Sequence, residues 1–170
     1  MQSNYLQNPK IVISNLTLDA PVTQAEAITK VESYCAYQER STYEVRNKLK
    51  TWDLTEPDIE IIISHLLEEN FLNEERFAEA YTLGKFRIKG WGKLKIKQAL
   101  KLKRVSPEII TKSLKKIDDK AYISRIKHLL ERKSSRLTEK IPYKRHQKLA
   151  QYAITKGFEQ EVIFKLLTKI

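Results

Sequence analysis

Basic side chains gather in one stretch of the sequence, and the chemistry open to them is the binding of anions. Lys85 to Arg104 holds nine Lys and Arg residues and no acidic residue. On a helix, Lys93, Lys97, Lys101 and Arg104 would share one face. Like charges on one stripe repel one another, so stabilising the helix is a poor reason for their presence. The pattern predicts contact with a polyanion, a nucleoprotein or an acidic protein groove, and the alternative is a solvated face.

The candidate contact residues are the basic side chains of this stretch and the tryptophan among them. They are Lys85, Arg87, Lys89, Trp91, Lys93, Lys95, Lys97, Lys101, Lys103 and Arg104. For the tryptophan two interpretations stay open: it packs against a boundary between structural units, or it stands exposed as an anchor for a partner.

Other chemistries lack the residues that they need. The three histidines, His65, His128 and His146, have no metal-ligand spacing, and no acid or cysteine completes a set. Gly90-Trp91-Gly92-Lys93 lacks the four residues between glycines and the preceding strand of a phosphate-binding loop, so we expect a turn between helices. No nucleophile set is present. We therefore expect no enzyme activity, no metal, no cofactor and no small-molecule ligand.

The elements that must position the basic stretch are indicated by a repeat of about 50 residues. Taking Leu54, Val105 and Phe158 as anchors, apolar residues recur 9 and 5 positions before each anchor and 5, 9 and 12 positions after it. The resulting 18 positions fit two short amphipathic helices joined at the anchor. The remaining members are Val45, Leu49, Ile59, Ile63, Leu66, Ile96, Leu100, Ile110, Leu114, Ile117, Leu149, Ala153, Ile163, Leu167 and Ile170.

The repeat predicts an all-α protein of three tandem three-helix repeats that form an elongated, curved body. We expect an acidic repeat at 23–72, a basic one at 73–117 and another basic one at 118–170. Residues 1–22, with the β-prone run at 10–18, are expected to be a partly disordered extension. Such a chain could bury one core or several small ones in series.

Helix starts are marked by capping residues. Thr23 with Glu26, and Ser41 with Glu44, have the spacing of capping boxes. Further N-caps are expected at Thr55, Asn73, Ser106 and Asp118. The one cysteine, Cys35, lies on the apolar stripe of the first helix, where a small buried side chain is expected.

Charge and composition limit which partner and which cellular compartment the protein can have. Residues 1–72 carry 6 basic and 11 acidic side chains, whereas 73–116 carry 13 and 4. A single cysteine fits a reducing compartment. No apolar run is long enough to span a membrane, and the N-terminus does not resemble a secretory signal. We therefore expect a cytoplasmic protein that does not enter membranes.

Three segments resemble one family. Arg40-Ser41-Thr42-Tyr43-Glu44-Val45-Arg46-Asn47-Lys48-Leu49 is similar to the R-S-x-x-E-L-x-x-K-L start of RecX regulatory proteins. The segment from Phe71 to Tyr81 resembles their L-[ND]-D/E-x-R-F-A-x-x-[FY] pattern. Lys89-Gly90-Trp91-Gly92, followed by Ile96, Leu100 and Val105, resembles their K-G-x-G segment and its apolar spacing, although Lys103-Arg104 stands where the family commonly has Lys-Gly.

The resemblance to RecX proteins implies three tandem three-helix units and a regulatory function in DNA repair and recombination. It implies binding to the RecA recombinase filament on single-stranded DNA, with restraint of its ATPase and strand exchange. The basic residues would then approach DNA phosphates or acidic RecA surface, and we expect a monomer. Two alternatives stay open: a stand-alone, non-sequence-specific nucleic-acid-binding protein, and a scaffold for an acidic protein.

Overall fold

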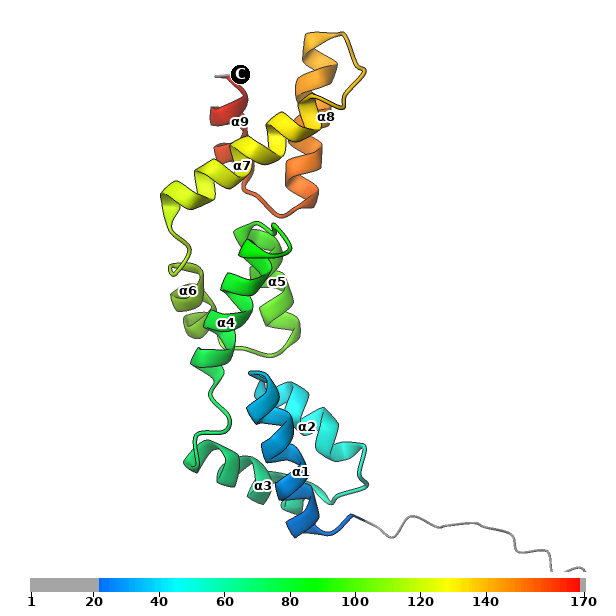
Figure 1. The fold of residues 1–170 in the computed structure, drawn as a ribbon, viewed down its shortest axis with the longest axis vertical. Coiled ribbons are helices and arrows are strands. Elements are labelled where there is room, and N and C mark those ends of the chain that lie inside the picture. Colours follow the sequence, from blue (N-terminus) through cyan, green and yellow to red (C-terminus); the bar gives the residue numbers. More distant parts are fainter. Residues whose placement is uncertain (1–21, 169–170) are drawn as a thin grey trace, which may run out of the picture.

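The computed structural model describes residues 22–168, and this part of the chain consists of helices and short connections without a β-strand (Figure 1). The helices are α1 (Gln24–Tyr37), α2 (Thr42–Lys50), α3 (Glu56–Glu68), α4 (Glu74–Arg87), α5 (Lys93–Leu102), α6 (Pro107–Leu114), α7 (Asp119–Ser134), α8 (Pro142–Thr155) and α9 (Gln160–Leu167). The all-α prediction is confirmed. The expected extension, up to residue 21, and Ile170 lie outside the described residues.

The helices begin where the capping residues predict. The Thr23 and Ser41 backbone N–H groups donate to the side chains of Glu26 (2.9 Å) and Glu44 (3.1 Å), and both capping boxes are complete. The four further N-caps also accept a backbone hydrogen bond from the third residue of their helices. A cap of this kind is worth about 1 kcal/mol to its helix. Local sequence therefore marks six of the nine helix starts within residues 22–168, whereas α5, α8 and α9 begin without a side-chain cap.

The helices form three triplets, α1–α3, α4–α6 and α7–α9, stacked along the long axis of an elongated body (Figure 1). The extensive helix–helix contacts lie within triplets: α3 packs on α1 and α2, α6 on α4 and α5, and α8 on α7 and α9. Most helix–helix contact is thus local to a triplet, which is the property expected of a tandem array.

The repeating apolar positions form the interior. Seventeen of them fall within the described residues, and all are buried except Leu54 and Leu114, which are half-buried against the core. Cys35 is also buried, and burial raises the pKa of its thiol to about 11. It is a packing residue.

The cores of the three triplets are not equally separate. The first triplet has its own buried cluster, around Val31 and Ile59. The second and third share one continuous cluster, linked by the rings of Phe86, Tyr122 and Phe158, whose centroids follow one another at 5.8 and 5.4 Å. Residues 22–168 therefore contain two cores: one in the first triplet and one that crosses from the second to the third.

Candidate nucleic-acid interface

The basic stretch of the sequence covers the end of α4, a tight turn and all of α5. In α5, Ile96 and Leu100 are fully buried, so the rest of the helix surface faces outward or toward neighbouring triplets. The turn forms because Gly90 adopts φ +64°, a conformation that favours glycine. There the Trp91 N–H donates to the Lys85 carbonyl (3.1 Å), which ends α4.

Two lysines of the expected stripe are free to meet a partner. Lys97 and Lys101 are exposed on α5, and neither pairs with a carboxylate in the part of the chain that the structure describes. Together with Lys95 they line a hollow of about 520 Å³ that also borders Ile154 and Thr155 of α8. This hollow is open and basic, and its walls include residues of α5 and α8.

Lys93 departs from the expectation that it faces solvent with the stripe. Its side chain is 24% exposed, and its ammonium lies 3.2 Å from Asp119 and 4.6 Å from the ring centroid of Tyr122. The reason is that the first turn of α5 is inserted against the third triplet. Lys93 is therefore part of a joint between triplets.

Lys103 and Arg104 face the first triplet. The Lys103 ammonium lies 2.6 Å from the carboxylate of Glu44, and both side chains are about one quarter exposed. Burial by itself raises the pKa of Glu44, but the hydrogen bonds from Lys103 and Ser41 outweigh burial, and the net pKa is lowered. The Arg104 guanidinium is 4.8 Å from the ring centroid of Tyr43.

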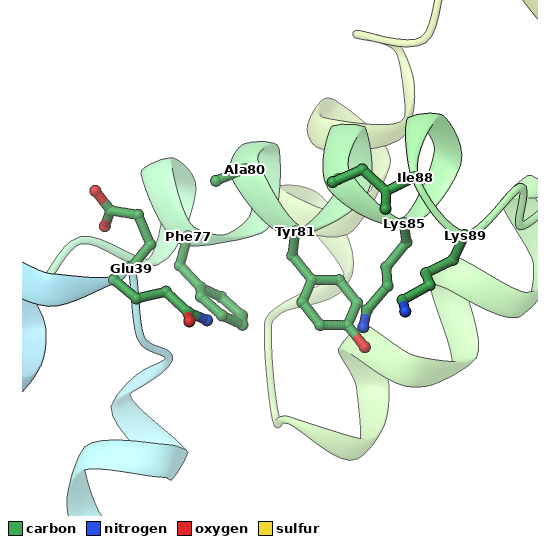
Figure 2. Close-up of a pocket in the computed structure, with 9 residues that line it drawn as sticks. Glu39, Phe77, Ala80, Tyr81, Lys85, Ile88 and Lys89 are labelled. Carbon is green, nitrogen blue, oxygen red and sulfur yellow. The ribbon is translucent and has the colours of Figure 1, made fainter.

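Lys85 and Trp91 pack against each other at the edge of the second core. Trp91 is half-buried, with the ammonium groups of Lys85 and Lys95 at 5.1 and 4.8 Å from its ring centroid. Figure 2 shows that Phe77, Tyr81 and Lys85 point to the same side of α4, into a cavity of about 300 Å³. Trp91 thus packs partly against the core, and its remaining surface stays available.

The first joint, between the first and second triplets, is polar. The Arg76 guanidinium lies 2.6 Å from the Glu39 carboxylate and donates to the side-chain and carbonyl oxygens of Asn70 (3.1 and 3.0 Å). The Glu74 carboxylate accepts from the Thr42 N–H at 2.5 Å. Pairing of Arg76 with a neighbouring carboxylate gives this residue a structural role.

The second joint, between the second and third triplets, includes backbone hydrogen bonds from one triplet to the other. The Gly92 N–H donates to the Lys156 carbonyl (2.8 Å), and the Leu94 N–H to the Gly157 carbonyl (3.0 Å). A Cβ on Gly92 would overlap the backbone of Gly157, so Gly92 serves this close approach as well as the turn. Gly157 has φ +88°. The crossing fixes one triplet against the next.

Tyr122 closes the second joint. Its hydroxyl accepts from the Lys93 N–H at 3.0 Å and donates to the Glu159 carboxylate at 2.5 Å. Burial, followed by the hydrogen bond to Glu159, raises the pKa of Tyr122 far above its usual value. The hydroxyl therefore remains a neutral bridge between the start of α5 and the start of α9.

Arg87 and Lys89 are exposed at the end of α4, and the structure brings them near side chains that the sequence did not single out. Lys89 lines a cavity with Arg125, His128 and Arg132 of α7. The only sequence signal for this set is the spacing of the three α7 residues, i, i+3 and i+7, which places them on one helix face.

Neither a metal-binding group of side chains nor a membrane-spanning helix is found within residues 22–168. No three His, Cys, Asp or Glu side chains there gather closely enough to hold a metal ion. None of the helices in this range is both long and apolar enough to cross a bilayer. The geometry is that of a helical scaffold with basic hollows.

Family models match the three helix triplets in order. The model described as the first three-helix domain of RecX matches residues 27–66, the second matches 73–114 and the third matches 121–167. The chain belongs to the RecX family. The resemblance in its sequence motifs is thereby confirmed.

RecX proteins of several bacteria are similar to this chain. A regulatory protein RecX from Halalkalibacterium halodurans is 34% identical over 130 residues, which is 76% of this chain and 49% of that protein. One from Lactobacillus gasseri is 29% identical over 150 residues, 86% of this chain and 54% of that protein. The chain spans about half the length of these RecX relatives.

A solved RecX structure has the same fold. RecX from Lactobacillus salivarius superimposes with a TM-score of 0.79 at 25% identity, covering 86% of this chain and 95% of that chain. Arg104, which stands where the RecX motif commonly has glycine, has φ +60° in this structure, and this left-handed region favours glycine.

Proposed function

We propose that this chain binds the RecA recombinase filament on single-stranded DNA and restrains its ATPase and strand exchange as a monomer. The observation that carries the proposal is the match of all three RecX three-helix domains, in series, to the three helix triplets. An elongated body with basic hollows suits a long, negatively charged nucleoprotein better than a small ligand.

The shape and charge of the molecule support a contact along its second and third triplets. Residues 73–116 carry 13 basic and 4 acidic side chains, and the exposed Lys97 and Lys101 lie in this part. The first triplet is acidic and would face basic protein surface. Restraint would then follow from occupying filament surface.

The test is the ATPase of RecA filaments assembled on poly(dT), titrated with the purified protein. We expect the rate to fall to a plateau as the protein saturates the filament, and strand exchange to fall with it. The protein alone should hydrolyse no ATP. Unchanged ATPase and strand exchange at saturating protein would rule out the proposed regulation.

Binding measured in three arms separates this function from its alternatives. Fluorescently labelled protein is titrated with bare oligo(dT), with bare RecA and with assembled filament. The proposal expects the tightest binding to filament. Equal affinity for bare DNA and filament would instead make the chain a general nucleic-acid-binding protein.

A further inference from the structure

A basic cavity of about 270 Å³ lies across the second joint, away from the α5 hollow. Its walls come from the end of α4 and from α7 and α8, and the polar groups that line it are Lys89, Arg125, His128, Arg132, Tyr152 and Lys156. Because α4 belongs to the second triplet and α7 and α8 to the third, the cavity exists only where the two triplets meet.

The charge of this cavity is uncompensated. No carboxylate lines it, and its four Lys and Arg side chains form no ion pair within residues 22–168. Elsewhere on the same triplets lysines do pair, as Lys112 does with Glu75 and Lys148 with Glu139. Four cations around one cavity repel one another, so packing alone does not account for them.

Several of these groups are held in place before any ligand arrives. The Arg125 guanidinium donates to the Arg87 carbonyl at 2.9 Å and lies 5.7 Å from the ring centroid of buried Phe86. The Lys156 ammonium lies 5.5 Å from the ring centroid of Tyr152. The Lys156 carbonyl accepts the Gly92 N–H, so the second joint also fixes the two walls of the cavity against each other.

We propose that this cavity binds a phosphodiester group of single-stranded nucleic acid. Guanidinium and ammonium groups on several sides match a backbone phosphate, whose two non-bridging oxygens share one negative charge and accept hydrogen bonds. The inference rests on the proposed function, since single-stranded DNA is the strand on which the filament assembles. It adds a contact contributed by the third triplet, because Arg125, Arg132 and Lys156 lie outside the basic stretch of α4 and α5.

The two basic hollows lie on either side of one helix end. Thr155 borders the α5 hollow and Lys156 borders the cavity, so both meet the last turn of α8. A single strand that occupies the cavity can continue toward Lys97 and Lys101. The cavity would therefore set the register of the strand on the protein.

The test reverses two charges at the cavity and two away from it. Lys89→Glu/Arg132→Glu changes exposed side chains of the cavity. Lys127→Glu/Lys144→Glu makes the same change in net charge at exposed positions of α7 and α8 that line none of the basic hollows. Affinity for fluorescein-labelled oligo(dT) is measured by anisotropy over a range of salt concentrations, and circular dichroism confirms that both variants are folded.

The cavity variant should bind oligo(dT) about tenfold or more weakly than the control variant. Its log–log salt slope should be smaller in magnitude by about 0.7, because the two substitutions together remove the contact with the one backbone phosphate that the cavity holds. Equal affinities of the two variants would overturn the proposal, and so would a wild-type protein that does not bind oligo(dT). Inorganic phosphate is titrated by calorimetry as a second arm. In one outcome the wild-type protein binds phosphate tightly, the cavity variant does not, and the oligo(dT) affinity of the cavity variant equals that of the control variant. This outcome would identify a site for free anions and would also overturn the proposal.

Failure of this inference is distinguishable from failure of the proposed function. If the cavity variant loses oligo(dT) affinity but the wild-type protein leaves RecA ATPase unchanged, phosphodiester binding in the cavity is supported and the proposed regulation of RecA is contradicted. If the wild-type protein lowers the ATPase while both variants bind oligo(dT) equally, the proposed regulation is supported and phosphodiester binding in the cavity is contradicted.

Discussion

At the scale of single residues, a residue can have a structural role that differs from the one its sequence pattern suggests. Gly92 and Lys93 are expected from sequence to form a turn and a solvent-facing stripe. Both are used in the second joint: Gly92 for a backbone crossing, and Lys93 for contacts with Asp119 and Tyr122. Spacing along one helix could not reveal this, because the partners lie 26 to 65 residues further along the chain.

Gly92→Ala tests the crossing. The added Cβ would overlap backbone atoms of Gly157 and Phe158, so the triplets must shift apart. We expect a loss of about 1–3 kcal/mol in the free energy of unfolding, measured with urea. Gly84→Ala is the matched control: it lies inside α4 with open space around its Cβ, and should be neutral or stabilise by up to about 1 kcal/mol. Equal effects of the two changes would contradict the close approach.

Glu44→Gln tests the ion pair across the first joint. Glutamine keeps the capping box but removes the charge that Lys103 meets, so stability at pH 7 should fall by about 0.5–1 kcal/mol. The folded-state pKa of Glu44 lies below its usual value of 4.5. The carboxylate therefore stabilises the fold above pH 4.5, and this contribution is lost as the pH falls through the folded pKa. Urea midpoints of the two proteins should converge at low pH, and a difference that persists there would count against the pair.

At the scale of helices, sequence predicted nearly everything that is local. Capping residues located six of the nine helix starts in residues 22–168, and the repeating apolar positions located the buried faces, because both depend on neighbours within a few turns. What the sequence did not predict is how α5 is oriented. Leu94 looks like a core position by type, yet it is 50% exposed, whereas the neighbouring Lys93 packs against Asp119 and Tyr122 of the third triplet.

Leu100→Ala tests the assignment of the buried face of α5. Leu100 is fully buried, so truncation should cost about 2–5 kcal/mol in unfolding free energy. Two residues along the same helix, Leu102 is 79% exposed, and Leu102→Ala should change stability by no more than about 0.5 kcal/mol. Thermal melts of the two variants compare them directly, and a Leu100→Ala melt like that of the wild type would show that the position is not core.

Lys97→Glu/Lys101→Glu tests the exposed part of the basic stripe. Both side chains face solvent without an ion pair in the described part of the chain, so the fold should be retained. Filament binding should weaken about tenfold or more, with a smaller salt slope, if these residues meet phosphates. If they meet acidic RecA side chains, affinity for bare oligo(dT) should barely change while filament affinity falls. Unchanged affinity in both assays would make the stripe a solvated face.

At the scale of the whole molecule, the two joints have different physical characters. The first is held by charged and polar side chains, whereas the second is held by backbone hydrogen bonds over a shared core. We propose the domain boundaries 72/73 and 117/118 on the basis of the repeat. The sequence could not show which joint is crossed by a continuous core, because the residue types at a boundary do not reveal whether the buried clusters on its two sides are in contact.

The two tryptophans allow the joints to be compared in one experiment. Trp52 packs against the first core and Trp91 against the shared core. With each tryptophan replaced by phenylalanine in turn, urea unfolding followed by the remaining fluorescence should give two different midpoints, because a polar joint couples the cores weakly. The unfolding curve measured by circular dichroism, which reports the helices of all three triplets, should extend over the urea concentrations of both transitions. Coincident midpoints for the two probes would show one cooperative unit.

The crossing of Gly92 and Gly157 has a consequence for how such chains diverge. A side chain at Gly92 collides with the backbone of its partner, so no second substitution at the partner can make room for it. Compensating pairs of changes, which reveal most contacts in alignments of diverged sequences, cannot arise here. We therefore expect this crossing to leave no covariation signal, although it sets the relative placement of two domains. The relative placement of the second and third triplets would thus depend on two glycines, positions at which there is no side chain to vary.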